Sequence, residues 1–98
     1  MAYNLKISLR AQKEIINTID LYISTIENAP NNFVIELQKI YRTLKINPFF
    51  EIRYKNIRSI KIKKYPYSIY FIIDEERQIV KILSCFHNKR NPLSRPTF

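Results

Sequence analysis

The sequence predicts an α+β fold in which an N-terminal helical hairpin covers one face of an antiparallel β-meander. About four strands are expected, in the order β-α-α-β-β-β. Two observations carry this prediction. Apolar residues recur at helical spacing over residues 9–46, and β-branched and aromatic residues dominate three short segments between residues 57 and 87. The chain of 98 residues is expected to form one domain over residues 1–98, with an irregular tail over 93–98.

The first 27 residues change from strand spacing to helix spacing. Tyr3, Leu5 and Ile7 alternate with polar residues, which predicts a first strand, and Ser8 is placed to cap the helix that follows. That helix is expected over 9–27, with polar residues such as Glu14 on its polar face. Its predicted apolar stripe recurs at steps of three and four residues: Ile15, Ile19, Tyr22, Ile23 and Ile26.

A second helix is predicted over 32–46, with Asn31 or Asn32 as its cap and the Asn47-Pro48 pair as its end. Because the connection between the helices is short, we expect them to form an antiparallel hairpin. Residues 49–54 fit either a short extra strand or an apolar plug. The predicted apolar stripe of the second helix is Phe33, Leu37, Ile40, Tyr41 and Leu44.

Three consecutive strands are predicted over 57–63, 68–74 and 78–87. The first of them alternates strictly, so Ile60 and Ile62 should face the core while Lys61 and Lys63 form a positively charged row on the opposite face. The other two are apolar on both sides. They are therefore expected to be central strands, or strands whose second face is covered.

The charge is concentrated in the predicted sheet. Lys and Arg number 17 against eight Asp and Glu, giving a net charge of +9, and residues 51–98 carry eleven of the basic and four of the acidic side chains. No acidic residue occurs over 53–72. A field of this sign attracts phosphate backbones or an acidic protein. A solvated cationic surface without a ligand is the alternative interpretation.

Several classes of protein are excluded by composition. The chain has no glycine, which excludes glycine-rich phosphate loops, and its single cysteine, Cys85, excludes an intrachain disulfide or a cysteine-cluster metal site. Cys85 is expected to be a small buried residue. We expect neither a cofactor nor a metal. The sequence has no apolar run long enough to span a membrane and no signal-peptide pattern, so a cytoplasmic location is expected.

The order of elements and a set of basic and aromatic motifs together resemble the RelE/ParE superfamily of bacterial toxins, over roughly residues 3–92. The resemblance implies a small cytoplasmic toxin that arrests growth and is neutralised by a cognate antitoxin. Relatives of the ParE kind poison DNA gyrase, and relatives of the RelE kind cut mRNA in the ribosome. The motifs that carry the resemblance are Arg53-Tyr54, Arg58, Ile62-Lys63-Lys64-Tyr65-Pro66-Tyr67 and Phe86-His87-Asn88-Lys89-Arg90-Asn91-Pro92.

The resemblance favours the ParE branch. The arginine that ribonuclease members use in the third strand would fall at about Tyr67, and the His-x-x-Arg ending is more similar to ParE. An mRNA endoribonuclease remains the alternative, and a basic nucleic-acid-binding module the residual one. His87 and Arg90 are the catalytic candidates, although a structural role for each stays open. The candidates for binding a target or nucleic acid are Arg53, Arg58, Lys61, Lys63, Lys64, Tyr65, Tyr67, Lys89 and Arg90.

The tyrosines divide into two groups. Tyr3, Tyr22 and Tyr41 fall on apolar faces and are expected in the core. The others are interleaved with the basic residues, where core packing and a stacking interface are both open. These are Tyr54, Tyr65, Tyr67 and Tyr70.

Overall fold

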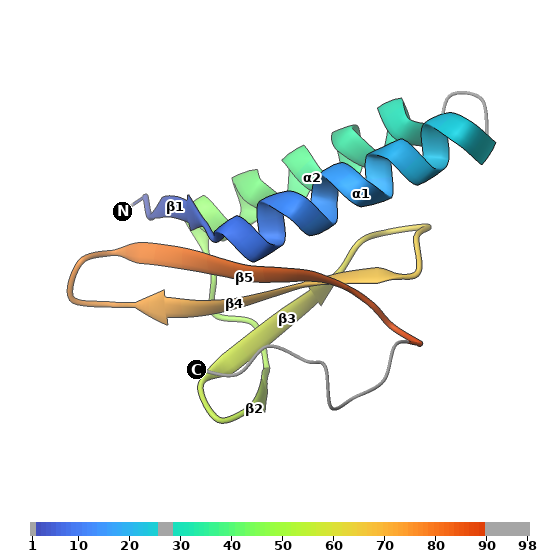
Figure 1. The fold of residues 1–98 in the computed structure, drawn as a ribbon. Coiled ribbons are helices and arrows are strands. Elements are labelled where there is room, and N and C mark those ends of the chain that lie inside the picture. The colour runs from blue at the N-terminus through green and yellow to red at the C-terminus, as the bar shows by residue number, and fades with distance from the viewer. Residues whose placement is uncertain (1, 26–28, 90–98) are drawn as a thin grey trace.

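A computed structural model describes residues 2–25 and 29–89 (Figure 1). The two helices lie side by side on one face of a five-stranded sheet, whose strand order is β1-β5-β4-β3-β2. The predicted α+β class is therefore confirmed. The elements in chain order are β1 (Asn4–Ile7), α1 (Leu9–Thr25), α2 (Ala29–Ile46), β2 (Ile52–Tyr54), β3 (Ile57–Lys61), β4 (Tyr67–Asp74) and β5 (Ile79–His87).

The sheet is mixed and has one strand more than the predicted four. Strands β2 to β5 form the expected antiparallel meander, and residues 52–54 supply the extra strand. The first strand, β1, pairs with β5 in parallel, from Asn4 opposite Ile79 to Ile7 opposite Ile82. Parallel pairing needs a long connection between the partners, and here the helices and the rest of the meander provide it.

Ser8 caps α1, as predicted, and also forms hydrogen bonds with β5 just beyond the end of β1. Its hydroxyl accepts a hydrogen bond from the amide of Ala11 at 3.0 Å, which satisfies one of the free donors of the first helical turn. The same hydroxyl donates to the carbonyl of Leu83 at 2.9 Å, and the amide of Ser8 donates to the carbonyl of Ile82 at 2.9 Å. The start of the helix is therefore bonded to β5.

The buried stripe of α1 differs in part from the prediction. Ala11 and Thr18 are buried against the sheet, whereas Ile23 is 66% exposed, so the prediction for Ile23 is wrong. Successive side chains of a helix are rotated by about 100° around its axis. The side chain of Ile23 therefore points about 100° away from that of the half-buried Tyr22 and leaves the buried face. Ile26 lies outside the described residues.

The second helix begins earlier than predicted. It starts at Ala29, so Asn31 and Asn32 lie within its first turn and the prediction that either of them caps it is wrong. Pro30 favours an early start, because proline is tolerated in the first turn of a helix. The helix ends at Ile46, before Pro48, as predicted. Its predicted stripe is confirmed as buried or half-buried: Phe33, Leu37, Ile40, Tyr41 and Leu44.

The sheet carries an apolar cluster on each face. The larger one packs beneath the helices and includes Phe71 and Ile82, both with no exposed surface. The smaller one lies on the opposite face, where Ile57, Tyr70 and Phe86 are buried. The prediction that β4 and β5 are apolar on both sides is thus confirmed. Within the described residues, neither helix is both long and apolar enough to cross a membrane.

Three turn residues adopt left-handed backbone conformations in a chain that has no glycine. They are Lys55, Lys64 and Gln78, with φ angles of 52°, 71° and 54°. A residue with a Cβ atom pays roughly 1–2 kcal/mol for this conformation. The contacts around these turns must therefore offset that cost.

Truncation of Ile82 tests the register of the last strand. Ile82 is fully buried in the larger cluster, so Ile82→Ala should lower the free energy of unfolding by about 2–5 kcal/mol through lost burial and a residual cavity. The measurement is a denaturant titration followed by circular dichroism. Ile16→Ala is the matched control, because Ile16 is 57% exposed and should lose far less. Equal losses for the two variants would contradict the register.

Candidate functional site

One carboxylate, that of Glu14, joins α1 to the last strand. Its Oε1 accepts hydrogen bonds from the hydroxyl of Ser84 at 2.6 Å and from the amide of Cys85 at 3.2 Å. Its Oε2 faces Nε of Arg10 at 3.4 Å, and only 15% of the Glu14 side chain is exposed. The expectation that Glu14 lies on the polar face of α1 is therefore wrong, because the carboxylate points at the sheet.

The carboxylate lies where the ladder of β5 is interrupted. Tyr70 pairs with Ser84 and Phe71 pairs with Ile82, so Leu83 is an extra residue in β5. A bulge of this kind disrupts the ladder locally. Pairing with β1 also ends at Ile82. Beyond that point the hydroxyl of Ser8 and the carboxylate of Glu14 supply the hydrogen-bond partners that a neighbouring strand would otherwise provide.

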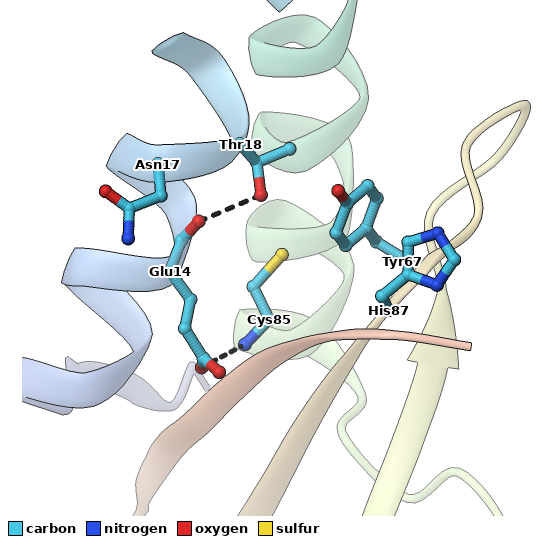
Figure 2. A pocket seen from close by; sticks show the side chains of 6 residues that line it. All are labelled: Glu14, Asn17, Thr18, Tyr67, Cys85 and His87. Carbon is cyan, nitrogen blue, oxygen red and sulfur yellow. Dashed lines mark hydrogen bonds between the residues drawn. The ribbon is translucent and has the colours of Figure 1, made fainter. Parts of the chain in front are cut away.

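A polar pocket opens beside this carboxylate, between α1 and the ends of β4 and β5 (Figure 2). Its volume is about 220 Å³. On the helix side, the Thr18 hydroxyl donates to the backbone carbonyl of Glu14 at 2.8 Å. On the sheet side, the rings of Tyr67 and His87 form the wall (Figure 2). The lining residues are Glu14, Asn17, Thr18, Tyr67, Cys85 and His87.

The imidazole of His87 is held in one orientation. Its ring packs edge-on against Tyr67, with 5.0 Å between the centroids, and its Nδ1 accepts the amide of Lys89 at 3.1 Å. The neutral ring therefore carries its proton on Nε2. In this arrangement His87 can donate a hydrogen bond, whereas the lone pair that would act as a base is already occupied.

The thiol of Cys85 is buried at the back of the pocket, with 2% of the residue exposed. Burial raises the pKa of the Cys85 thiol to about 12, and the nearby Glu14 carboxylate acts in the same direction. The neutral thiol is a poor nucleophile. The prediction that Cys85 is a small buried residue is confirmed.

The predicted basic residues of the β3–β4 connection form a cationic turn, defined here as Lys61, Lys63 and Lys64. All three side chains are exposed, and Nζ of Lys61 donates to the carbonyl of Tyr65 at 3.1 Å. Ile60 and Ile62 pack beneath the helices, so by strand alternation Lys61 points to the opposite face. Arg53 is exposed on β2, near the other end of β3.

Arg58 does not join the cationic turn. Its guanidinium donates to the carbonyl of Phe50 at 2.7 Å and lies 5.4 Å from the centre of the Phe49 ring. These contacts hold the segment between α2 and β2 against the sheet. The side chain of Arg58 is therefore engaged in the fold.

The four tyrosines with open assignments divide between the two faces of the sheet. Tyr65 contacts the ring of Phe33 at 5.3 Å, and Tyr67 contacts the same ring at 6.2 Å, so both pack at the end of the helical layer. Tyr54 and Tyr70 contact each other at 6.3 Å on the opposite face. All four therefore make ring contacts within the chain.

The structure places several of the predicted site residues at one end of the sheet and leaves Arg53 and Arg58 elsewhere. His87 and Tyr67 line the pocket beneath α1, and the exposed Lys89 follows His87. The cationic turn leads directly into Tyr67, and the amide of Asn88 donates to the carbonyl of Pro66 at 2.9 Å, whereas Lys61 points to the face away from the helices. Arg90 lies outside the described residues. Sequence reasoning missed Glu14 as a site residue because its polar neighbours in α1 gave no sign that this one carboxylate turns inward.

An apolar groove lies between the two helices, with a volume of about 420 Å³. Ile16 lies at its wall and is 57% exposed. Exposed apolar surface of this kind marks sites of protein interaction. The lining residues are Ile7, Gln12, Ile15, Ile16, Ile19, Val34, Leu37, Gln38 and Tyr41.

No protein-family model matches the sequence, and no curated protein matches it. Solved structures do resemble the chain. A chain of the chromosomal ParDE TA system from P. aeruginosa has a TM-score of 0.73 at 16% identity, over 88% of this chain and 96% of that one. The free E. coli toxin RelE, in a mutant form, has 0.64 at 19% identity, over 91% and 86%. The archaeal RelE-RelB complex from Pyrococcus horikoshii has 0.59 at 13% identity, over 93% and 100%.

The raised pKa of Cys85 makes a prediction about alkaline stability. The thiol ordinarily loses its proton at a pKa of 9.0, whereas in the folded chain the pKa is about 12. The unfolded chain therefore releases this proton first, and the thiol's contribution to stability is lost as the pH rises from 9.0 to about 12. Denaturant titrations across that range should show a steeper decline for the parent chain than for Cys85→Ala.

The parent chain should also react slowly with a thiol reagent when folded and rapidly when unfolded. Burial raises the pKa of Tyr41 to about 12 as well, and the neighbouring Cys85 adds to this shift, so Cys85→Ala should keep only the larger, burial-driven part of the decline due to Tyr41. Parallel stability profiles for the two chains would contradict the assignment to Cys85.

Proposed function

We propose that this chain, which has the fold of the ParE and RelE toxins, is the toxin of a bacterial toxin-antitoxin module. In this proposal it is a cytoplasmic protein of one domain that arrests growth and is neutralised by a cognate antitoxin. The observation that carries the proposal is the fold shared with the ParDE, RelE and RelE-RelB structures over most of the chain. The net charge of +9 agrees with a protein that binds an acidic partner.

We further propose that the toxin acts by binding its target, as an inhibitor of DNA gyrase, rather than by cutting RNA. Attack by a 2′-hydroxyl needs a base, an acid and a cation around one phosphate. His87 instead shares its pocket with the carboxylate of Glu14, and its Nδ1 is already occupied by the amide of Lys89. Lys61 points away on the opposite face of the sheet. This separation supports binding over catalysis.

The endoribonuclease remains the second candidate because of one specific observation. Lys61, Lys63 and Lys64 are exposed together beside Tyr65, and such a turn could hold the backbone of an RNA. In that case the target would be mRNA in the ribosome.

Replacement of His87 distinguishes the two mechanisms. If the chain binds gyrase, His87→Ala should leave induced growth arrest and the loss of plasmid supercoiling essentially unchanged, because the pocket takes no part in chemistry. An endoribonuclease that used this imidazole would lose about a hundredfold or more of its cleavage. The assay is induced expression in a bacterial host, with growth, supercoiling and mapped mRNA ends read in parallel.

The control in this assay is Lys13→Ala with Lys45→Ala, a double variant on the helices that alters exposed side chains outside the pocket and the cationic turn. Cleavage of mRNA by the parent chain that disappears in His87→Ala would overturn the proposed mechanism. A parent chain that arrests no growth in any host tested would overturn the proposal of a toxin.

Charge reversal on the cationic turn tests its contact with the antitoxin. Lys61→Glu with Lys63→Glu should slow association with the protein encoded beside this chain by roughly tenfold at low salt, because opposite charge steers the encounter. Stopped-flow fluorescence at low and high ionic strength measures the effect. Lys13→Glu with Lys45→Glu is the matched control, since it changes the net charge equally on the helices. Equal slowing by both pairs would assign the effect to net charge alone.

A further inference from the structure

Two lysines, Lys6 and Lys81, lie side by side at the edge of the sheet, remote from the cationic turn. They are partners in the parallel register of β1 and β5. Neighbouring strands are about 4.8 Å apart, so the two side chains start close together. Leu5 and Val80, which flank them in sequence, pack beneath the helices, so both lysines project from the opposite face. Lys6 is exposed and Lys81 is half-buried.

This pairing is electrostatically unfavourable in the free chain. Like charges placed opposite each other on neighbouring strands destabilise a sheet. Among residues 2–25 and 29–89, no ion pair joins either lysine to a carboxylate. Asp74 is on the same face of β4, but its carboxylate accepts the amide of Arg77 at 3.2 Å and faces the Arg77 guanidinium at 4.0 Å. The described part of the fold thus provides no counterion.

Both lysines line a groove of about 360 Å³ whose other lining residues are largely apolar. Leu9 contributes to it and is 66% exposed, and Leu83 contributes a half-buried side chain. Among residues 2–25 and 29–89, no aromatic side chain lines the groove. The lining residues are Lys6, Ile7, Ser8, Leu9, Lys81, Ile82 and Leu83.

Protection of the sheet edge against pairing with a second chain explains only one of the two lysines. A lysine on an edge strand prevents a second chain from pairing with it, and β1 is an edge strand. That role accounts for Lys6. It does not account for Lys81, because β5 lies between β1 and β4 and has no free edge along residues 79–82.

We propose that the groove at Lys6 and Lys81 binds an acidic, amphipathic segment of a partner protein. Carboxylates of the segment lie between the two ammonium groups and relieve their repulsion, while its apolar side chains cover Leu9 and Leu83. A nucleic acid fits less well, because its bases would find no aromatic ring to stack on. The identification of the partner as an antitoxin rests on the proposed function, but the binding chemistry does not.

The first test uses the free chain. Lys6→Gln and Lys81→Gln should each raise the midpoint of denaturant unfolding, and the double variant should gain less than the sum of the two, because removal of either lysine ends the repulsion. Lys13→Gln with Lys45→Gln is the control, since these exposed lysines lie on different helices and should give additive effects. Additive effects at Lys6 and Lys81 would contradict their electrostatic coupling.

The second test measures binding by fluorescence anisotropy. The probe is a short fluorescein-labelled peptide that alternates leucine and glutamate, and the comparison probes are the same peptide with glutamine for glutamate and a single-stranded oligonucleotide of equal charge. Lys6→Gln and Lys81→Gln should each weaken binding of the glutamate peptide by about two- to fivefold. The control lysine variants should retain parental affinity for it.

Four results would overturn the inference. The first two are parental affinity for the glutamate peptide in both lysine variants, and binding of the glutamine peptide as tight as that of the glutamate peptide. The other two are a loss of oligonucleotide affinity in the lysine variants as large as their loss of peptide affinity, and self-association of the double variant with unchanged peptide affinity. The last of these would leave only the protective role of Lys6. Failure of this inference is separate from failure of the proposed function. If the chain arrests no growth but binds the peptide through these lysines, the proposed binding groove stands. Only the identification of its partner as an antitoxin then fails.

Discussion

The bond between Glu14 and the bulge of β5 is the constraint on which the arrangement of the two layers depends. Strand β5 extends beyond the end of its partner β1 and changes register at Leu83, so its outer edge needs both a hydrogen-bond donor and an acceptor from elsewhere. Ser8 and Glu14, one turn and more apart at the start of α1, supply these contacts. The helix is thereby fixed in direction over the sheet. The polar pocket exists because a carboxylate, rather than an apolar side chain, fills this position.

At the far end of the helices, aromatic packing holds a turn that lacks glycine. Lys64 adopts a φ of 71°, which is costly for a residue with a side chain. The next residue, Tyr65, places its ring 5.3 Å from those of both Tyr22 and Phe33, and its carbonyl accepts a hydrogen bond from Lys61. These contacts select the strained conformation. The positions of the exposed lysines are therefore set by the same core that joins the helices to the sheet.

Periodic patterns predicted most of the fold, and local exceptions to them account for what was missed. The stripe of α2 and the alternation in β3 are properties of one face, so the residues themselves reveal them. The parallel pairing of β1 with β5 depends on contacts between segments that are distant in the sequence. The residues of one strand do not indicate which other strand it pairs with. Glu14 was misplaced for a related reason. A carboxylate among other polar residues looks exposed, and only the bulge 70 residues away makes its burial favourable.

The distribution of functional groups follows from a sheet that is buried on both sides. Because β4 and β5 carry apolar clusters on each face, polar and cationic side chains are displaced to the perimeter: the pocket of His87 at one strand end, the cationic turn, and the edge at Lys6 and Lys81. The perimeter placement of these groups is therefore a consequence of how the two faces of the sheet are filled.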